Sequence, residues 1–126
     1  MKIIHTTKAP KAIGPYSQAI YAGNTLYLSG QLPIDPKTGE TPKTVGEQTL
    51  KALENLQAIV LEAGLKITDI VKCTVLMKDL HFFSEMNDVY ASFFGSHKPA
   101  RVAYEVARLP KDVLVEIDAI AVKTNG

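Results

Sequence analysis

The chain has 126 residues, enough for one domain with a hydrophobic core and too few for a second domain of ordinary size. Its 14 basic and 13 acidic side chains nearly balance, which argues against a large nucleic-acid surface. It has no apolar run near the ~20 residues of a membrane span, and its first ten residues lack the core of a signal peptide. We therefore expect residues 1–126 to form one cytoplasmic domain that contacts neither nucleic acid nor membrane.

The first forty residues predict short strands and turns. Residues 2–6 are expected to form one strand, and residues 17–22 and 25–30 to form a hairpin around Gly23 and Asn24. The segment DPKTGE that follows has the composition of a loop.

The next segment predicts a helix with a clear start and stop. Thr44 and Glu47 have the spacing of a capping box, and Gly64 is a typical terminator. Between them, one helical face collects Leu53, Leu56, Val60 and Ala63.

A strand and a second helix come next. Residues 70–78 alternate as in a half-buried strand, whose apolar side is Val71, Cys73, Val75 and Met77. A helix from about His81 to Gly95 follows, whose core face is expected to carry Phe82, Met86, Val89 and Phe93.

The last segment, PARVAYEVARLPKDVLVEIDAIAV (residues 99–122), is interpreted as a hairpin that turns at LPKD. The element order then predicts an α+β fold, a mostly antiparallel sheet with two helices on one face. The final strand is apolar on much of both sides, whereas two helices cover only one face. We therefore expect the second face to meet another subunit.

Charged side chains in this apolar segment are candidates for a site. If Val106 lies opposite Val115, then Glu105 faces Glu116, and Arg101 lies on the same face. Two carboxylates beside one guanidinium would raise at least one carboxyl pKa and favour proton transfer. A structural ion network at a subunit seam accounts for the same charges equally well, so spacing alone leaves both interpretations open.

Other chemistry-bearing residues give weaker signals. In GPYSQA and LSGQLP, Ser29 and Gly30 are typical of a strand end, although Gly30 would also open backbone N–H groups to a ligand and Tyr16 would supply a hydroxyl. The single cysteine, Cys73, is expected to be buried and structural. No metal site is predicted, because the histidines are scattered and are expected to be exposed: His5, His81 and His97.

Four segments carry a resemblance to a known family: IGPYSQA, LYLSGQLPIDPKTGE, DIVKCTVLMKDL and PARVAYEVARLPKDVLVEIDAIAV. They resemble the reactive intermediate deaminase family, also called RidA or YjgF-type, over about residues 3–123. The resemblance implies a chorismate-mutase-like homotrimer with three sites in the clefts between subunits. It also implies hydrolysis of 2-imino acids and enamines, such as 2-aminoacrylate and 2-iminobutyrate, to 2-keto acids and ammonia. Such an activity needs no cofactor and protects pyridoxal-phosphate enzymes.

The same resemblance implies roles for individual residues. Arg101 matches the arginine that grips the substrate carboxylate, and Glu116 matches the acid near the attacking water. The matching pocket residues are Tyr16, Ser29, Gly30 and Asn87. Many members have Ser-Cys after the arginine, where this chain has Val102 and Ala103; the Ala103 carbonyl could still orient a water. Glu105 and Asp118 are assigned to structure.

Two other functions remain open on the sequence. A non-catalytic trimer could bind small keto acids through Arg101. The family's older labels, ribonuclease and translation inhibitor, suggest an RNA-directed role, which the balanced charge weakens.

Overall fold

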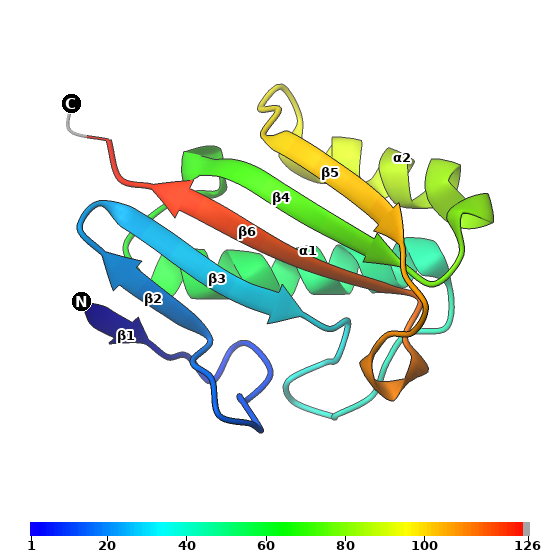
Figure 1. Ribbon diagram of the computed structural model, residues 1–126, viewed down its shortest axis with the longest axis horizontal. Coiled ribbons are helices and arrows are strands. Elements are labelled where there is room, and N and C mark those ends of the chain that lie inside the picture. Colours follow the sequence, from blue (N-terminus) through cyan, green and yellow to red (C-terminus); the bar gives the residue numbers. More distant parts are fainter. Residues whose placement is uncertain (125–126) are drawn as a thin grey trace.

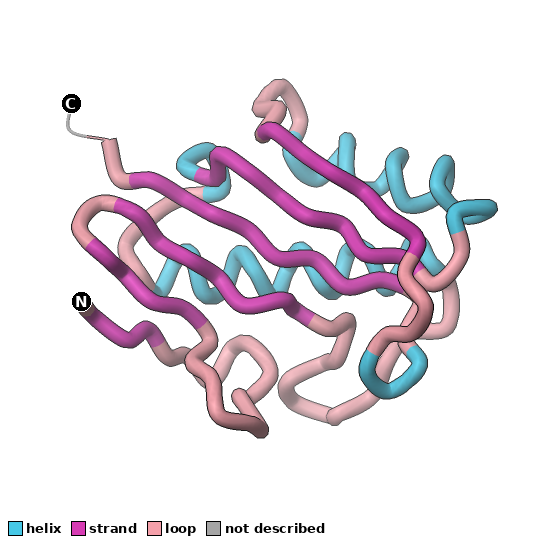
Figure 2. The backbone as a smooth tube through the Cα atoms, viewed as in Figure 1, coloured by secondary structure: helices cyan, strands magenta, loops and turns pink. Residues whose placement is uncertain are grey.

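The computed structural model describes residues 1–124 as a single sheet backed by helices (Figure 1). The strands and helices are β1 Lys2–Ile4, β2 Ala19–Ala22, β3 Thr25–Gln31, α1 Val45–Glu62, β4 Ile70–Met77, α2 Phe83–Phe94, β5 Ala100–Glu105 and β6 Val115–Val122. The strand order is β1-β2-β3-β6-β4-β5, and only the β4–β5 pair is parallel. Both helices lie behind the sheet in Figures 1 and 2. The predicted α+β class is confirmed, with two helices on one face of a mostly antiparallel sheet.

Helix α1 begins and ends as the sequence predicts. The Thr44 side chain accepts a hydrogen bond from the Glu47 N–H at 3.1 Å, and Glu47 Oε1 accepts from the Thr44 N–H at 3.4 Å. The chain leaves the helix at Gly64, whose φ of 81° is costly for other residues. Three of the four predicted core residues are fully buried, namely Leu53, Leu56 and Val60.

The core face of α2 differs from the prediction. Met86, Tyr90 and Phe94 are buried, four residues apart along one face, whereas Phe82 is 45% exposed. The reason is that Phe82 lies in a 3₁₀ turn, Leu80–Phe82, and the α-helix begins only after it. A 3₁₀ turn has three residues per turn, so helical periodicity cannot be extended back through it.

Strand β4 buries its predicted side with one exception. Cys73, Val75 and Met77 are fully buried, but Val71 is 46% exposed and Ile70 is buried in its place. The β4–β6 pairing shifts register between Ile70 and Lys72, and an extra residue in a strand reverses which side its neighbours face.

The predicted C-terminal hairpin is wrong. Strand β4 lies between β5 and β6 (Figure 1), and Leu76 pairs with Tyr104 on one side and Glu116 on the other. The Val106 N–H bonds to the Met77 carbonyl at 2.9 Å rather than to Val115. Residues 106–114, which contain the 3₁₀ turn Pro110–Asp112, are a longer connection than a tight turn and pass the end of β4. Glu105 therefore does not face Glu116.

The second sheet face carries no helix (Figure 1). Val115, Ile117, Ala119 and Ala121 of β6 are buried on the helix side, and the alternate residues point to the opposite face. Tyr27 and Tyr104, each 52% exposed, belong to the same face because they pair with Ile120 and with Leu76. Within residues 1–124 no segment covers this face, and its predicted contact with another subunit remains a prediction.

Candidate functional site

A pocket of about 470 Å³ opens where β3 ends beside the start of β6. Its polar wall contains Tyr16, Ser29 and Glu116, and Lys11 and Lys111 also line it. The apolar wall consists of Pro10, Ile13, Leu32, Ile34 and Pro110. A cavity that combines an apolar wall with a few convergent polar groups is typical of a small-molecule site.

Gly30 and Glu116 are in direct contact in this pocket. The β3–β6 pairing shifts register between Leu28 and Gln31, so Ser29 and Gly30 lie at an irregularity of the strand. A Cβ at Gly30 would clash with Glu116 Oε2 and would lie 3.0 Å from the carboxyl carbon. Glycine is therefore required here for the close approach of a carboxylate to the backbone.

The environment of Glu116 weakens its acidity. Partial burial raises the pKa of Glu116 above its usual value, and the negative charge of Asp118 raises it further. Asp118 is engaged in the sheet, where its Oδ1 accepts the Thr74 N–H at 3.1 Å, in agreement with its predicted structural role. A carboxyl group with a raised pKa exchanges a proton closer to neutral pH, as a general acid or base requires.

Buried hydrogen bonds hold the N-terminal loop against β3. The Gln18 side chain, 2% exposed, accepts the Thr6 N–H at 2.8 Å and donates to the Pro10 carbonyl at 2.9 Å. The Ser29 hydroxyl donates to the Ser17 carbonyl at 2.6 Å. These bonds fix both ends of the segment that carries Tyr16, a half-exposed residue on the pocket wall.

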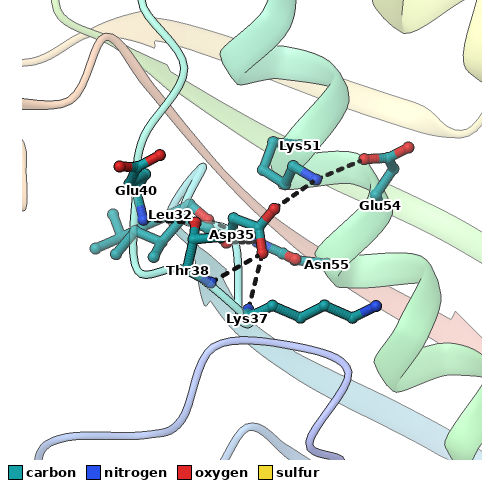
Figure 3. A network of polar contacts seen from close by, with 9 residues as sticks. Leu32, Asp35, Lys37, Thr38, Glu40, Lys51, Glu54 and Asn55 are labelled. Atoms are coloured by element: carbon teal, nitrogen blue, oxygen red, sulfur yellow. Dashed lines mark hydrogen bonds and ion pairs between the residues drawn. The ribbon is translucent and has the colours of Figure 1, made fainter.

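A second polar network fixes the loop after β3 (Figure 3). The Asn55 amide of α1 donates to the carbonyls of Leu32 and Ile34 at 3.0 and 2.9 Å. Asp35 Oδ1 accepts hydrogen bonds from the backbone N–H groups of Lys37, at 2.8 Å, and Thr38, at 3.3 Å. The bond from Lys37 holds the pKa of Asp35 below its usual value. Asp35 Oδ2 lies 3.8 Å from Lys51 Nζ. The apolar wall formed by Leu32 and Ile34 is thereby tied to the core helix.

Arg101 lies in a second pocket, of about 410 Å³, next to α2. Its Nη1 donates to Asn87 Oδ1 at 2.7 Å. The guanidinium carbon lies 4.8 Å from the centre of the Tyr90 ring and 5.5 Å from that of Phe83. Among residues 1–124 no carboxylate lies within ion-pairing distance of Arg101, whose charge is therefore available to an external anion.

The predicted residues thus divide between two places. The first pocket gathers Tyr16, Ser29, Gly30 and Glu116, while the second holds Asn87 and Arg101. Arg101 of β5 pairs with Cys73 of β4, on the helix side of the sheet, whereas Glu116 of β6 pairs with Leu76 of β4, on the open side. The predicted cluster of Arg101 and Glu116 on one face of one chain is therefore wrong.

Ala103 lies in neither pocket. It pairs with Val75 on the helix side of β5 and packs against the core. Glu105, on the same strand, accepts the Leu80 N–H at 3.0 Å, which agrees with its predicted structural role.

The single cysteine and two of the three histidines lie where the sequence predicts. Cys73 is buried as predicted, and burial raises its pKa to about 11. His5 and His81 are exposed as expected, but His97 is partly buried and its Nε2 lies 2.7 Å from the Ile70 carbonyl oxygen. In the described part of the chain, no three His, Cys, Asp or Glu side chains are grouped to hold a metal ion. No described helix is long and apolar enough to cross a membrane.

Sequence reasoning missed several pocket residues. Lys11 and Lys111 line the first pocket, but nothing in their spacing distinguishes them from surface lysines. Tyr90 and Phe83 both contact Arg101. Phe83 is four residues before Asn87 and Tyr90 is three residues after it, so all three lie on one face of α2. This spacing could have identified the two aromatic residues from the sequence.

The chain is a small α+β domain with two pockets that border its sheet, and comparisons with known proteins identify its family. The model of the family described as Endoribonuclease L-PSP matches residues 6–123. The chain belongs to this family, which is the reactive intermediate deaminase (YjgF/RidA) family. The predicted resemblance is confirmed.

Individual relatives cover nearly the whole chain. A RutC family protein of Pyrococcus horikoshii is 58% identical over 97% of this chain and 98% of its own. The 2-iminobutanoate/2-iminopropanoate deaminase of Escherichia coli is 54% identical, with the same coverage of both chains. A crystal structure of E. coli TdcF with bound serine superposes with a TM-score of 0.96 at 50% identity, covering 98% of this chain and 100% of the other.

Proposed function

We propose that this protein hydrolyses 2-imino acids and their enamine tautomers, such as 2-iminobutyrate and 2-aminoacrylate, to 2-keto acids and ammonia, and so protects pyridoxal-phosphate enzymes. The observation that carries the proposal is Glu116, a carboxyl group of raised pKa pressed against Gly30 inside a pocket of substrate size. Support comes from the deaminase of E. coli, 54% identical, and from the serine bound to TdcF, a small amino acid.

The proposed reaction needs little from the protein. The imine carbon is an electrophile, and it is a stronger one when the nitrogen is protonated. Water adds to this carbon, with Glu116 accepting a proton from the water and returning it to the nitrogen. The hydroxyl proton of the resulting carbinolamine then passes to the nitrogen, the C=O bond forms as the C–N bond breaks, and one imine and one water give one keto acid and one ammonia. Ser29 and Tyr16 line the space for this water and the substrate.

The substrate carboxylate is assigned to Arg101, because a planar guanidinium suits a bidentate carboxylate contact. Arg101 and Glu116 of one chain lie on opposite sheet faces, so this assignment requires Arg101 from a second copy. We therefore propose a homotrimer in which the uncovered sheet faces pack together. Each complete site would combine Tyr16, Ser29, Gly30 and Glu116 of one subunit with Asn87 and Arg101 of its neighbour.

The first experiment generates 2-aminoacrylate or 2-iminobutyrate with a separate dehydratase and follows its disappearance. Purified protein is expected to accelerate clearance, and Arg101→Ala is expected to abolish the acceleration. Arg108→Ala is the matched control, because Arg108 is exposed and lines neither of the two pockets. A folded protein that gives no acceleration would leave the non-catalytic binder as the better function.

Complementation tests the shared site. Alone, Arg101→Ala is expected to be inactive, and Glu116→Gln is expected to be about 10²–10⁴-fold slower than wild type. If every site uses Arg101 and Glu116 from different subunits, co-expression of the two variants restores about a quarter of the wild-type sites by random assembly. A site within one chain would restore none. Light scattering on the same samples measures the oligomeric state, and a monomer would exclude the trimer.

A further inference from the structure

The guanidinium of Arg101 is held by α2 rather than by another charge. Among the described residues its one hydrogen bond is the 2.7 Å contact from Nη1 to Asn87 Oδ1. A guanidinium has five N–H donors, so four remain for a ligand. A cation on a long side chain with a single fixed donor would sample many orientations unless something else restrained it.

The restraint comes from two aromatic rings. The guanidinium carbon lies 4.8 Å from the centre of the Tyr90 ring and 5.5 Å from that of Phe83, both within the ~6 Å at which a cation and a ring attract. Phe83, Asn87 and Tyr90 are spaced by four and three residues along α2, so all three project from one face of the helix. That face meets Arg101 on the helix side of β5.

The Tyr90 ring is itself immobilised. It is 7% exposed, and its centre lies 4.9 Å from that of Phe94. Its hydroxyl is buried without a hydrogen-bond partner among the described residues. Tyr90 therefore offers Arg101 the face of a fixed ring, and its hydroxyl does not contribute a bond.

We propose that Phe83, Asn87 and Tyr90 form a three-sided holder that fixes the guanidinium plane of Arg101, so that its free N–H donors meet a planar carboxylate in one orientation. The identity of that carboxylate, an imino acid, rests on the function proposed above. Phe83 and Tyr90 are positioning residues that act through Arg101. The holder suits a flat guanidinium and not an ammonium group, which has no plane to orient.

The test removes the rings one at a time. Tyr90→Leu and Phe83→Leu are each expected to raise KM for the imine by roughly two- to thirty-fold, the range of a cation–ring contact, with kcat changed less than about twofold. Tyr90→Phe keeps the ring and is expected to rescue KM. Phe93→Leu is the matched control, because Phe93 lies on the same helix and contacts Phe94.

A second readout does not depend on hydrolysis. The side-chain N–H signal of Arg101, assigned in nuclear magnetic resonance spectra by its loss in Arg101→Lys, is expected to be shifted by the ring currents of Tyr90 and Phe83. Tyr90→Leu should move this signal toward the position of a solvated arginine, and Tyr90→Phe should leave it in place. Titration with 2-oxobutyrate, followed at the same signal, is expected to give weaker binding in Tyr90→Leu.

The two proposals fail in different ways. Wild-type protein that shows the shifted signal but clears no imine would refute the deaminase function and leave the holder standing. An Arg101 signal that does not move in either ring variant, or a KM that stays at the wild-type value in both, would overturn the holder. If Tyr90→Leu does not fold, as its thermal unfolding would show, Phe83→Leu decides the question, since Phe83 is only partly buried.

Discussion

Gly30→Ala should lower the rate of imine clearance strongly and change the free energy of unfolding little. The added methyl group would clash with Glu116 Oε2 and would lie 3.0 Å from the carboxyl carbon, so the Glu116 side chain must leave its position. The obstacle is the far end of a flexible side chain, and the φ of Gly30 lies outside the left-handed region, so the backbone can accept alanine. The substitution therefore displaces one carboxylate from the pocket and leaves the strand in place.

The two effects differ greatly in size. Replacing glycine by alanine at a compatible position stabilises a protein by about 0.4–1 kcal/mol through the unfolded chain. Forcing Glu116 off its preferred rotamer costs about 0.5–1.5 kcal/mol, so the net change in unfolding free energy is within about 1 kcal/mol. A misplaced general acid or base, by contrast, lowers the rate by about 10²–10⁴-fold.

Urea unfolding and imine clearance measure the two effects on the same protein. The control is the double variant Gly30→Ala with Glu116→Gln. It should clear the imine only a little more slowly than Glu116→Gln alone, because both substitutions remove the function of the same carboxylate, that of Glu116. Wild-type clearance by Gly30→Ala would refute the reasoning, since it would show that the Glu116 carboxylate need not touch the Gly30 backbone. A multiplicative loss in the double variant would equally refute it.

Three further substitutions test other parts of the argument. Burial raises the native pKa of Glu116 above the ordinary glutamate value of about 4.3. The stability that this group contributes to the wild type is therefore present below about pH 4.3 and is lost as the pH rises through the native pKa. Glu116→Gln should melt at a higher temperature than wild type at about pH 8, and the difference should vanish near about pH 4. Asn55→Leu leaves two loop carbonyls without donors and should lower the unfolding free energy by about 2–4 kcal/mol in urea; an unchanged midpoint would contradict the role of this network. Thr44→Ala removes the α1 cap and should lower it by about 1 kcal/mol, whereas the neighbouring exposed Lys43→Ala should have little effect.

Local signals in the sequence predicted the elements well but not their pairing. The Thr44 cap, the Gly64 stop and the alternation around Val75 each depend on a few neighbouring residues, and each is present in the structure. The C-terminal hairpin failed because strand pairing depends on contacts distant in sequence: β4 enters between β5 and β6, and no local feature of LPKD reports this. The shift of the α2 face similarly came from a 3₁₀ turn that periodicity does not reveal.

This one topological fact also explains why spacing could not define the site. A hairpin would have placed Arg101 and Glu116 on one face, whereas the observed order puts β4 between them and turns Arg101 toward α2. The two side chains then lie in different local environments: partial burial raises the pKa of Glu116, and the Arg101 guanidinium lies against two aromatic rings. Had they been adjacent, an ion pair would have lowered the Glu116 pKa and occupied the Arg101 donors. Because the two residues are separated within one chain, Glu116 stays a weak acid and the Arg101 donors stay open to a substrate carboxylate. In the proposed assembly, a second subunit completes the site.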